Sequence, residues 1–371
     1  MIVSSRRLMR RRLAVMTALV GGGFAACARL GSADDEPRDE PVETAVPIST
    51  APAETPVPPT PVPEPTPVPT PIPSLAVYYD PSYVMAGYSY ETTRKARWVA
   101  DSLAQNPIPR LELIAPRSLE EAEIAAVHDP VYVQAIRTGQ PKTLAQSQGF
   151  VWDPQLLPAV LASNGGAVEA ALRVFRTAGR VAGSLSSGLH HAHRTYGLGN
   201  CTFNGLALAT RAALAAGAKN VLVLDLDAHC GGGTNELVGS DPRVWHTDIA
   251  VHPFDKYTPA PRQTLDVVQA ARSYLPTIEK RLDELKDRAP AFDLCVYNAG
   301  MDPHERCPVG GLAGVTRDVL EARERMVFQW LRERGLPAAF VLAGGYIGNG
   351  LDQGGLVGLH RLTLDAAASW L

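Results

Sequence analysis

A short apolar run followed by acidic residues and a histidine constrains this chain more than any other stretch. Val221 to Leu224 contains β-branched and leucine residues without polar alternation, as in a parallel strand covered on both faces. Asp227 and His229 follow it, and the glycines Gly231 to Gly233 supply the backbone freedom for a tight exit from the strand. Ligands of open α/β sheets bind at the carboxyl ends of strands. Because residues two apart point the same way from an extended backbone, Asp227 and His229 can share one metal ion.

The chain from Leu75 onwards predicts one α/β domain that reaches Leu371. Helical stretches alternate with strand-like runs, which favours a mainly parallel sheet. Glycines that follow two of the helices, Gly217 and Gly335, are expected to cap them. The predicted strands are Leu75 to Tyr79, Val221 to Leu224, Leu294 to Tyr297 and Ala339 to Leu342, and the predicted helices are Asn204 to Ala216, Asp266 to Leu285 and Arg317 to Arg334.

Residues 1–27 have the pattern of an export signal. Five arginines precede the apolar run Leu13 to Val20, which is shorter than the about 20 residues of a membrane-spanning helix. Phe24-Ala25-Ala26-Cys27 resembles the lipobox of bacterial lipoproteins, which makes Cys27 the expected lipidation site, and Ser5-Arg6-Arg7-Leu8-Met9 is similar to a twin-arginine signal. Cleavage without lipidation stays open as an alternative, as does an ordinary buried cysteine. We expect an exported protein anchored to the outer face of a bacterial membrane.

Residues 28–74 are expected to form a disordered linker. Proline recurs at every second position through much of Glu36 to Ser74, and Thr-Pro-Val-Pro repeats three times. Proline removes backbone donors and favours polyproline II, so no core can form there. At about 3.1 Å per residue, such a spacer could hold the domain on the order of 100 Å from an anchor.

Charge and cysteine spacing exclude two classes of site. The net charge of −3 and the lack of a Lys/Arg stripe in the folded part argue against a nucleic-acid partner. Cys201, Cys230, Cys295 and Cys307 have none of the paired spacings of a structural zinc site. Nothing in the sequence indicates an oligomeric state.

Three further motifs follow strand-like runs or lie in glycine-rich loops. Each by itself has an ordinary explanation: a hydrogen-bonded histidine pair, a turn before proline, and a tight loop with a packed aromatic ring. They are Gly188-Leu189-His190-His191-Ala192, Asn298-Ala299-Gly300-Met301-Asp302-Pro303 and Leu342-Ala343-Gly344-Gly345-Tyr346.

Together with Asp227 and His229, these motifs stand in an order and at spacings that resemble the histone deacetylase family of zinc amidohydrolases. The resemblance extends over residues 75–371 and includes the early segment from Ser118 to Tyr132. It implies a single three-layer α/β domain of the arginase-deacetylase type, in which helices flank a mainly parallel sheet. It also implies removal of an acetyl or similar small acyl group from an amine.

The resemblance assigns the metal ligands to Asp227, His229 and Asp302. These residues would hold one zinc ion per chain and leave coordination positions for water and substrate. The family also has a monovalent-cation site, and Ala250 stands here in place of a serine associated with it. Potassium binding is therefore an open expectation.

The resemblance also assigns the catalytic groups. His191 would be the general base, and His190, held by Asp225, its electrostatic partner. Tyr346 would donate its hydroxyl to the oxyanion of the tetrahedral intermediate. The substrate pocket would be formed by Gly199, Asn200, Phe254 and Gly344.

The sequence departs from the family pattern at several of these positions. Gly232 stands where an Asp or Asn would orient the general base, so we expect His191 to lack its usual partner. Cys230 replaces a second histidine, and Cys307 replaces an aspartate. Asn200 stands where the family has an aromatic wall of its acyl-lysine tunnel, so the pocket should be more open or more polar there.

Two alternatives remain beside a deacetylase. A ureohydrolase of the arginase type would hold two manganese ions, but it needs a carboxylate at the position of Gly231. A non-catalytic, envelope-tethered binding protein would keep the zinc pocket without turnover. For the deacetylase, acetyl-lysine peptides, acetylpolyamines and other small acetylated amines are all candidate substrates.

Overall fold

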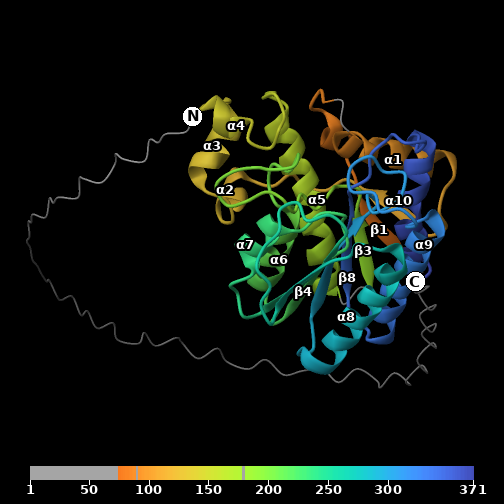
Figure 1. Ribbon diagram of the computed structural model, residues 1–371. Coiled ribbons are helices and arrows are strands. Elements are labelled where there is room, and N and C mark those ends of the chain that lie inside the picture. Colours follow the sequence, from red (N-terminus) through yellow and green to blue (C-terminus); the bar gives the residue numbers. More distant parts are fainter. Residues whose placement is uncertain (1–73, 89–90, 178–179) are drawn as a thin grey trace, which may run out of the picture. The chain divides into compact units, whose positions relative to one another are not determined.

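The computed structural model describes residues 74–88, 91–177 and 180–371 (Figure 1). The expected export signal with Cys27, and the linker up to residue 73, lie outside the described residues. Within the described ranges, no helix is both long enough and apolar enough to cross a membrane.

A single eight-stranded sheet forms the centre of the described part, with the strand order β2-β1-β3-β8-β7-β4-β5-β6. Every pair of neighbouring strands is parallel. The expectation of an α/β fold with a mainly parallel sheet is therefore confirmed. The strands are β1 Leu75–Tyr78, β2 Leu111–Ile114, β3 Val181–Ser184, β4 Val221–Asp225, β5 Val244–Ala250, β6 Gln263–Val267, β7 Leu294–Gly300 and β8 Ala338–Ala343.

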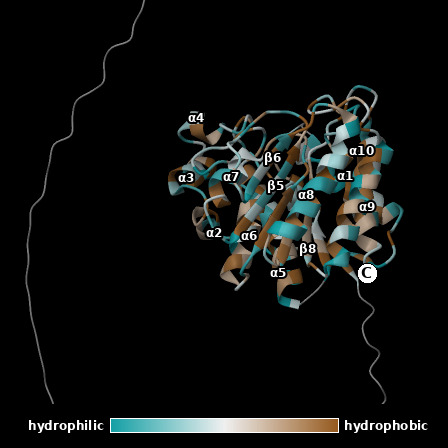
Figure 2. Cartoon of the chain, turned by 60° about the horizontal axis from the view of Figure 1, so that its bottom comes forward, coloured by the Kyte–Doolittle hydropathy of each residue, from teal (hydrophilic) through white to brown (hydrophobic). Residues whose placement is uncertain are grey.

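Helices cover both faces of the sheet, so the domain has three layers (Figure 1). In Figure 2 the helices α8 and α9 carry both brown and teal residues, as expected for helices that bury one face. The helices are α1 Lys95–Gln105, α2 Glu121–Ala125, α3 Pro130–Thr138, α4 Lys142–Ala145, α5 Leu156–Thr177, α6 Gly205–Ala215, α7 Gly232–Val238, α8 Tyr274–Arg288, α9 Arg317–Glu333 and α10 Gln353–Ala368.

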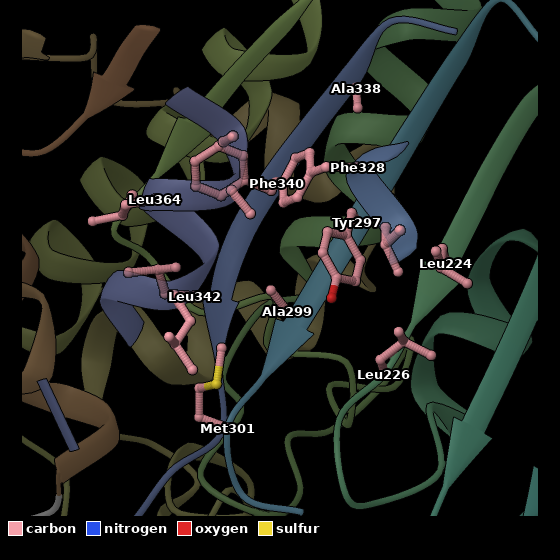
Figure 3. Packing of buried hydrophobic residues seen from close by; sticks show 14 of the residues in the cluster. Leu224, Leu226, Tyr297, Ala299, Met301, Phe328, Ala338, Phe340, Leu342 and Leu364 are labelled. Carbon is pink, nitrogen blue, oxygen red and sulfur yellow. The ribbon is translucent and has the colours of Figure 1, made fainter. Parts of the chain in front are cut away.

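Alternate residues of the central strands feed two separate cores. Phe340 and Leu342 of β8 point into a cluster with α1, α8, α9 and α10, and Figure 3 shows Phe340 beside Phe328 of α9. Ala339 and Val341 point into the opposite cluster, against α5 and α6. Both faces of these strands are therefore buried, which explains why their sequences lack polar alternation.

Two helices end at the expected glycines, whereas one helix begins later than its local sequence indicates. Gly217 and Gly335 adopt φ of 110° and 58° just after α6 and α9, as expected for C-terminal caps. The helix predicted from Asp266 begins only at Tyr274. That prediction was wrong because Asp266 and Val267 belong to β6, where they pair with Ile249 and Ala250 of β5.

The parallel arrangement brings all the strand-end motifs to one edge of the sheet. β3, β8, β7 and β4 are consecutive neighbours, and their carboxyl ends lead into the loops that carry the candidate residues. The histidine pair follows β3, Asp227 and His229 follow β4, Asp302 follows β7, and Tyr346 follows β8. Residues far apart in the sequence thus meet at this edge.

Candidate active site

Three buried ligand groups converge beyond β4 and β7. Asp227, His229 and Asp302 each offer one ligand atom, and these atoms lie within 4.8 Å of one another. Nδ1 of His229 lies 3.2 Å from Oδ1 of Asp227 and 3.1 Å from Oδ2 of Asp302. Burial and the nearby charge of Asp227 raise the pKa of Asp302. Two buried carboxylates that face one imidazole would be stabilised by a cation between them.

The chemistry of these donors fits a divalent metal ion. Oδ1 of Asp302 accepts a hydrogen bond of 2.9 Å from the backbone N–H of Ala228, whereas its Oδ2 is buried and accepts none from the described residues. Carboxylate oxygen and imidazole nitrogen are both ligands of zinc. Because Oδ2 of Asp302 accepts no hydrogen bond from the described residues, it is available to an ion.

Gly344 packs closely against Asp302. Its backbone has φ of 50°, and a Cβ atom there would lie 2.2 Å from Oδ1 of Asp302. Its carbonyl accepts a 2.5 Å hydrogen bond from Nζ of the wholly buried Lys95. Gly344 is not among the residues that line the cavity described below, and its assignment to the substrate pocket stays a prediction. A glycine is needed there because the strand exit passes so close to the carboxylate.

A buried arginine from α9 joins the two strands that deliver the ligands. Nη1 of Arg323 donates to the carbonyl oxygens of Gly300 and Leu226, at 2.6 and 3.3 Å. Its Nε donates to Oε1 of Glu324 at 2.8 Å, and both side chains have no exposed surface. Leu226 directly precedes Asp227, and Gly300 stands two residues before Asp302. Arg323 therefore fixes the spacing of the two strand exits.

The two histidines after β3 are adjacent but have different environments. Their ring centroids are 4.0 Å apart. Nδ1 of His190 lies 2.8 Å from Oδ2 of Asp225. Burial opposes its charge, but the carboxylates of Asp225 and Asp227 raise the pKa of His190 to about 10. Burial and the charge on His190 lower the pKa of His191 to about 4, so His191 is neutral at neutral pH and able to accept a proton.

His191 has a carboxylate partner, contrary to the expectation drawn from Gly232. Its Nδ1 lies 2.9 Å from Oδ2 of Asp255, a residue 64 positions away in the loop after β5. A Cβ atom at Gly232 would lie 2.4 Å from both the carbonyl oxygen and Oδ1 of Asp255. Asp255 thus occupies the space that the absent side chain leaves free. No motif marks Asp255, since only the path of its loop brings it to His191.

An open cavity of about 610 Å³ leads to the ligand cluster. His191, His229 and Tyr346 lie along its wall. Burial and the charge of Asp302 raise the pKa of Tyr346 well above its usual value, so its hydroxyl remains a donor. The cavity therefore presents a base and a hydroxyl donor beside the ligand cluster.

Three of the four predicted pocket residues line this cavity. Phe254 contributes an aromatic side, with its ring centroid 4.9 Å from that of His191. Gly199 and Asn200 also line the cavity. Asn200 adopts φ of 64°, a left-handed conformation that asparagine tolerates better than an aromatic residue does. The amide of Asn200 thus stands at the position where the family pattern has an aromatic wall.

The residues around Gly231 leave no room for a further carboxylate. A Cβ atom at Gly231 would lie 2.9 Å from Oδ2 of Asp225. Sγ of Cys230 lies 3.6 Å from the carbonyl oxygen of His252 and does not belong to the ligand cluster. Within the described ranges, only Asp227, His229 and Asp302 form a group able to hold a metal ion. This geometry favours a single ion.

An asparagine that the motifs did not single out anchors the histidine loop. Nδ2 of Asn204 donates to the carbonyl oxygens of His190 and Ala192, each at 3.2 Å. Its backbone N–H donates to Nε2 of His128 at 2.9 Å. The early His-Asp-Pro segment therefore supports the loop of the histidine pair from beneath.

Comparisons with known proteins agree with this geometry. A sequence model described as "Histone deacetylase domain" matches residues 89–355. An uncharacterized protein of Picosynechococcus sp. is 32% identical over 264 residues, which cover 69% of this chain and 85% of that protein. Histone deacetylase 2 of Arabidopsis thaliana is 26% identical over 251 residues, which cover 63% of each chain. The matched part therefore spans less than two thirds of that relative.

Solved structures match the fold at low identity. The HD domain of HDA15 superposes with a TM-score of 0.65 over 80% of this chain and 89% of its own, at 21% identity. Acetylpolyamine aminohydrolase from Burkholderia pseudomallei gives a TM-score of 0.63 over 80% of this chain and 99% of its own, also at 21% identity. The fold is therefore of the arginase-deacetylase type.

Proposed function

Because the chain belongs to the histone deacetylase family, we propose that it is a zinc-dependent hydrolase that removes an acetyl or small acyl group from an amine. The family supports a hydrolase that acts on amides. The observation that carries the proposal is the convergence of Asp227, His229 and Asp302 with a neutral, oriented His191 in one open cavity. Such a site can bring a water molecule to an amide carbonyl.

The side chains at the cavity have separate roles in the proposed hydrolysis. Nε2 of His191 accepts a proton from the attacking water while Nδ1–H stays hydrogen-bonded to Asp255, and the same imidazole then returns the proton to the leaving amine. Tyr346 donates its hydroxyl to the oxyanion. His190, held by Asp225, keeps a positive charge close to the reacting groups.

A zinc ion held by Asp227, His229 and Asp302 would acidify the attacking water and polarise the acyl carbonyl. The mixed set of two carboxylates and one imidazole supports zinc. The described residues contain a single ligand group and leave no space at Gly231, which argues against the pair of manganese ions of a ureohydrolase.

The non-catalytic alternative loses its main argument. That alternative depended on a general base without a partner, and Asp255 fills the role of the partner. A binding protein would have no need to hold His191 in one tautomer. We therefore favour turnover over binding alone.

The shape of the cavity supports small or extended acetylated amines as substrates. The cavity is open, Phe254 provides an apolar side, and Asn200 provides a polar one. A flexible aliphatic amine that carries an acetyl group would fit such walls, as in an acetyl-lysine peptide or an acetylated polyamine.

The proposal is tested on the purified full chain by metal analysis and by acetate release from acetylated amines and acetyl-lysine peptides. About one zinc per chain and acetate release that a chelator abolishes would support it. Two manganese ions with urea release would replace it with the ureohydrolase. Bound zinc without turnover on the whole set of substrates would favour the binding protein.

We also propose that the protein is exported and anchored through a lipid on Cys27. The basic, apolar and small-residue order of residues 1–27 supports this proposal. Fractionation of cells and labelling with a radioactive fatty acid would test it, with Cys27→Ala as the control. Label and membrane association that depend on Cys27 are expected, and an unlabelled protein in the cytoplasmic fraction would overturn the proposal.

A further inference from the structure

A series of four contacting histidine and acidic side chains leads from His191, the proposed general base, to the protein surface. Nδ1 of His191 lies 2.9 Å from Oδ2 of Asp255, and Oδ1 of Asp255 lies 3.0 Å from Nε2 of His193. Nδ1 of His193 in turn contacts Oε2 of Glu236. The exposed fractions of the four side chains rise in this order, from 5% and 9% to 11% and 43%. The series therefore connects a buried imidazole to a solvated carboxylate.

The conformation of Asp255 indicates that its neighbours hold it in place. Its φ is 59°, a left-handed value that few residues other than glycine adopt. Strain of this kind persists only where surrounding contacts determine the geometry. Besides the two histidines, the backbone N–H of Gly233 donates to Oδ2 of Asp255 at 3.2 Å. The two carboxylate oxygens thus have three donors.

His193 is held as tightly as the carboxylate that it contacts. Each of its ring nitrogens faces a carboxylate, which requires both to carry protons. Its ring stacks on Tyr196, with centroids 4.6 Å apart and an interplanar angle of 11°. A cationic, stacked imidazole favours the ionised form of Asp255 and fixes the direction of its Oδ1 atom.

We propose that Asp255 and His193 are positioning residues of this enzyme: Asp255 holds His191 in its Nδ1–H tautomer, and His193, tied to Glu236, holds Asp255. The proposal rests on the proposed function, in which Nε2 of His191 takes the proton from water. A tautomer with the proton on Nδ1 leaves the Nε2 lone pair free for that step. No proton needs to move along the series.

The same arrangement explains how the chain does without a carboxylate at position 232. The loop after β5 delivers Asp255, and Gly232 supplies the space that it needs. His193 and Glu236 then fix a side chain that comes from a loop rather than from the stretch that carries the metal ligands.

Asp255→Gly removes the carboxylate but leaves the backbone conformation unstrained, because glycine readily adopts a φ of 59°. We expect this variant to lose about 10²-fold in kcat, with KM and zinc content within about threefold of wild type. Asp255→Asn keeps an acceptor for Nδ1–H and should retain most of kcat. His193→Phe preserves the stack on Tyr196 and should lose about tenfold in kcat. Lys256→Ala, on the same loop and exposed, is the matched control.

Added formate should restore part of the kcat of Asp255→Gly and none of that of His191→Ala. A carboxylate with only a structural role would give no such rescue. Equal kcat values for wild type and Asp255→Gly would overturn the proposal.

Nitrogen-15 NMR of the histidine rings reads the tautomer without any turnover. We expect wild-type His191, assigned by comparison with His191→Gln, to carry its proton on Nδ1, and Asp255→Gly to shift it toward Nε2–H. An unchanged tautomer would overturn the proposal. If the tautomer differs between wild type and Asp255→Gly as expected but wild type releases no acetate, the positioning role is supported and the proposed function is rejected instead.

Discussion

Gly232 and Asp255 compete for one volume beside His191. A Cβ atom at residue 232 would lie 2.4 Å from the carbonyl oxygen of Asp255 and 2.4 Å from its Oδ1 atom. The family pattern places an Asp or Asn at position 232, whereas this chain brings its carboxylate from a different loop. The two ways of orienting the base exclude each other.

Gly232→Asp is therefore expected to impair the enzyme rather than to improve it. The new side chain must displace the loop of Asp255, and two carboxylates would repel each other in a buried site. We expect a melting temperature several degrees lower and a clear fall in kcat. Gly358→Asp is the control, since a Cβ atom there meets no atom within 4 Å. Full turnover and an unchanged melting temperature for Gly232→Asp would contradict this prediction, because they would mean that the loop of Asp255 moves without loss of stability.

His191→Ala and Tyr346→Phe test the two catalytic groups. Each should lower kcat at least about 10²-fold, because one removes the base and the other the donor to the oxyanion. Tyr346→Phe keeps the ring, so its melting temperature should match that of wild type. Tyr79→Phe, which lies outside the cavity lining, is the control and should keep its kcat. Steady-state acetate release would measure all three, and a tenfold or smaller loss would contradict the assigned roles.

Removal of the metal should abolish turnover and lower the melting temperature. Without a cation, the buried carboxylates of Asp227 and Asp302 face each other across His229, which is unfavourable. Dialysis against a chelator followed by calorimetry would measure the loss, and added zinc should restore both quantities. Asp302→Asn should bind zinc at least about tenfold more weakly. Activity that survives complete removal of metal would reject the zinc mechanism.

Arg323→Leu should be among the most destabilising substitutions in the domain. It leaves Glu324 as a buried, unpaired charge and removes the donor to the carbonyl oxygens of Leu226 and Gly300, with an expected loss of about 3–5 kcal/mol in the free energy of unfolding. Arg325→Leu on the same helix breaks only an exposed pair with Glu321 and should cost no more than about 1 kcal/mol. Urea titrations would measure the unfolding free energy of both variants, and equal losses would contradict the structural role given to Arg323.

Asp241 makes a pH-dependent contribution to stability far from the active site. Hydrogen bonds from Arg243 lower the pKa of Asp241 to about 2, below its ordinary value of 3.8. A depressed folded-state pKa adds stability that is fully present above about pH 4 and is lost as the pH falls through about 2. The difference in unfolding free energy between wild type and Asp241→Asn should therefore shrink over this window. Urea titrations between about pH 2 and about pH 7 would measure the difference, and a difference that does not change with pH would contradict this contribution of Asp241.

Local patterns were sufficient to predict much of the fold and part of the site. Residues 221–224 showed by their lack of polar alternation that β4 is buried on both faces, and the glycines after α6 and α9 marked the helix ends. Asp225, Asp227 and His229 could be placed together because two-residue spacing on an extended backbone sets a common direction. In contrast, the start of α8 was misplaced, because pairing of Asp266 with β5 overrides its local helical pattern.

The sequence by itself therefore determined the class of fold and the strand-end residues, since these depend on periodicity and spacing within a few positions. Only the tertiary structure decided which carboxylate lies beside His191, that His193 and Glu236 stand behind it, and that Gly344 packs closely against Asp302. These relationships join residues that are 42 to 64 positions apart, as Gly344–Asp302 and His191–Asp255 illustrate. They depend on where a loop passes in space and on a left-handed φ at one aspartate, which no local pattern encodes.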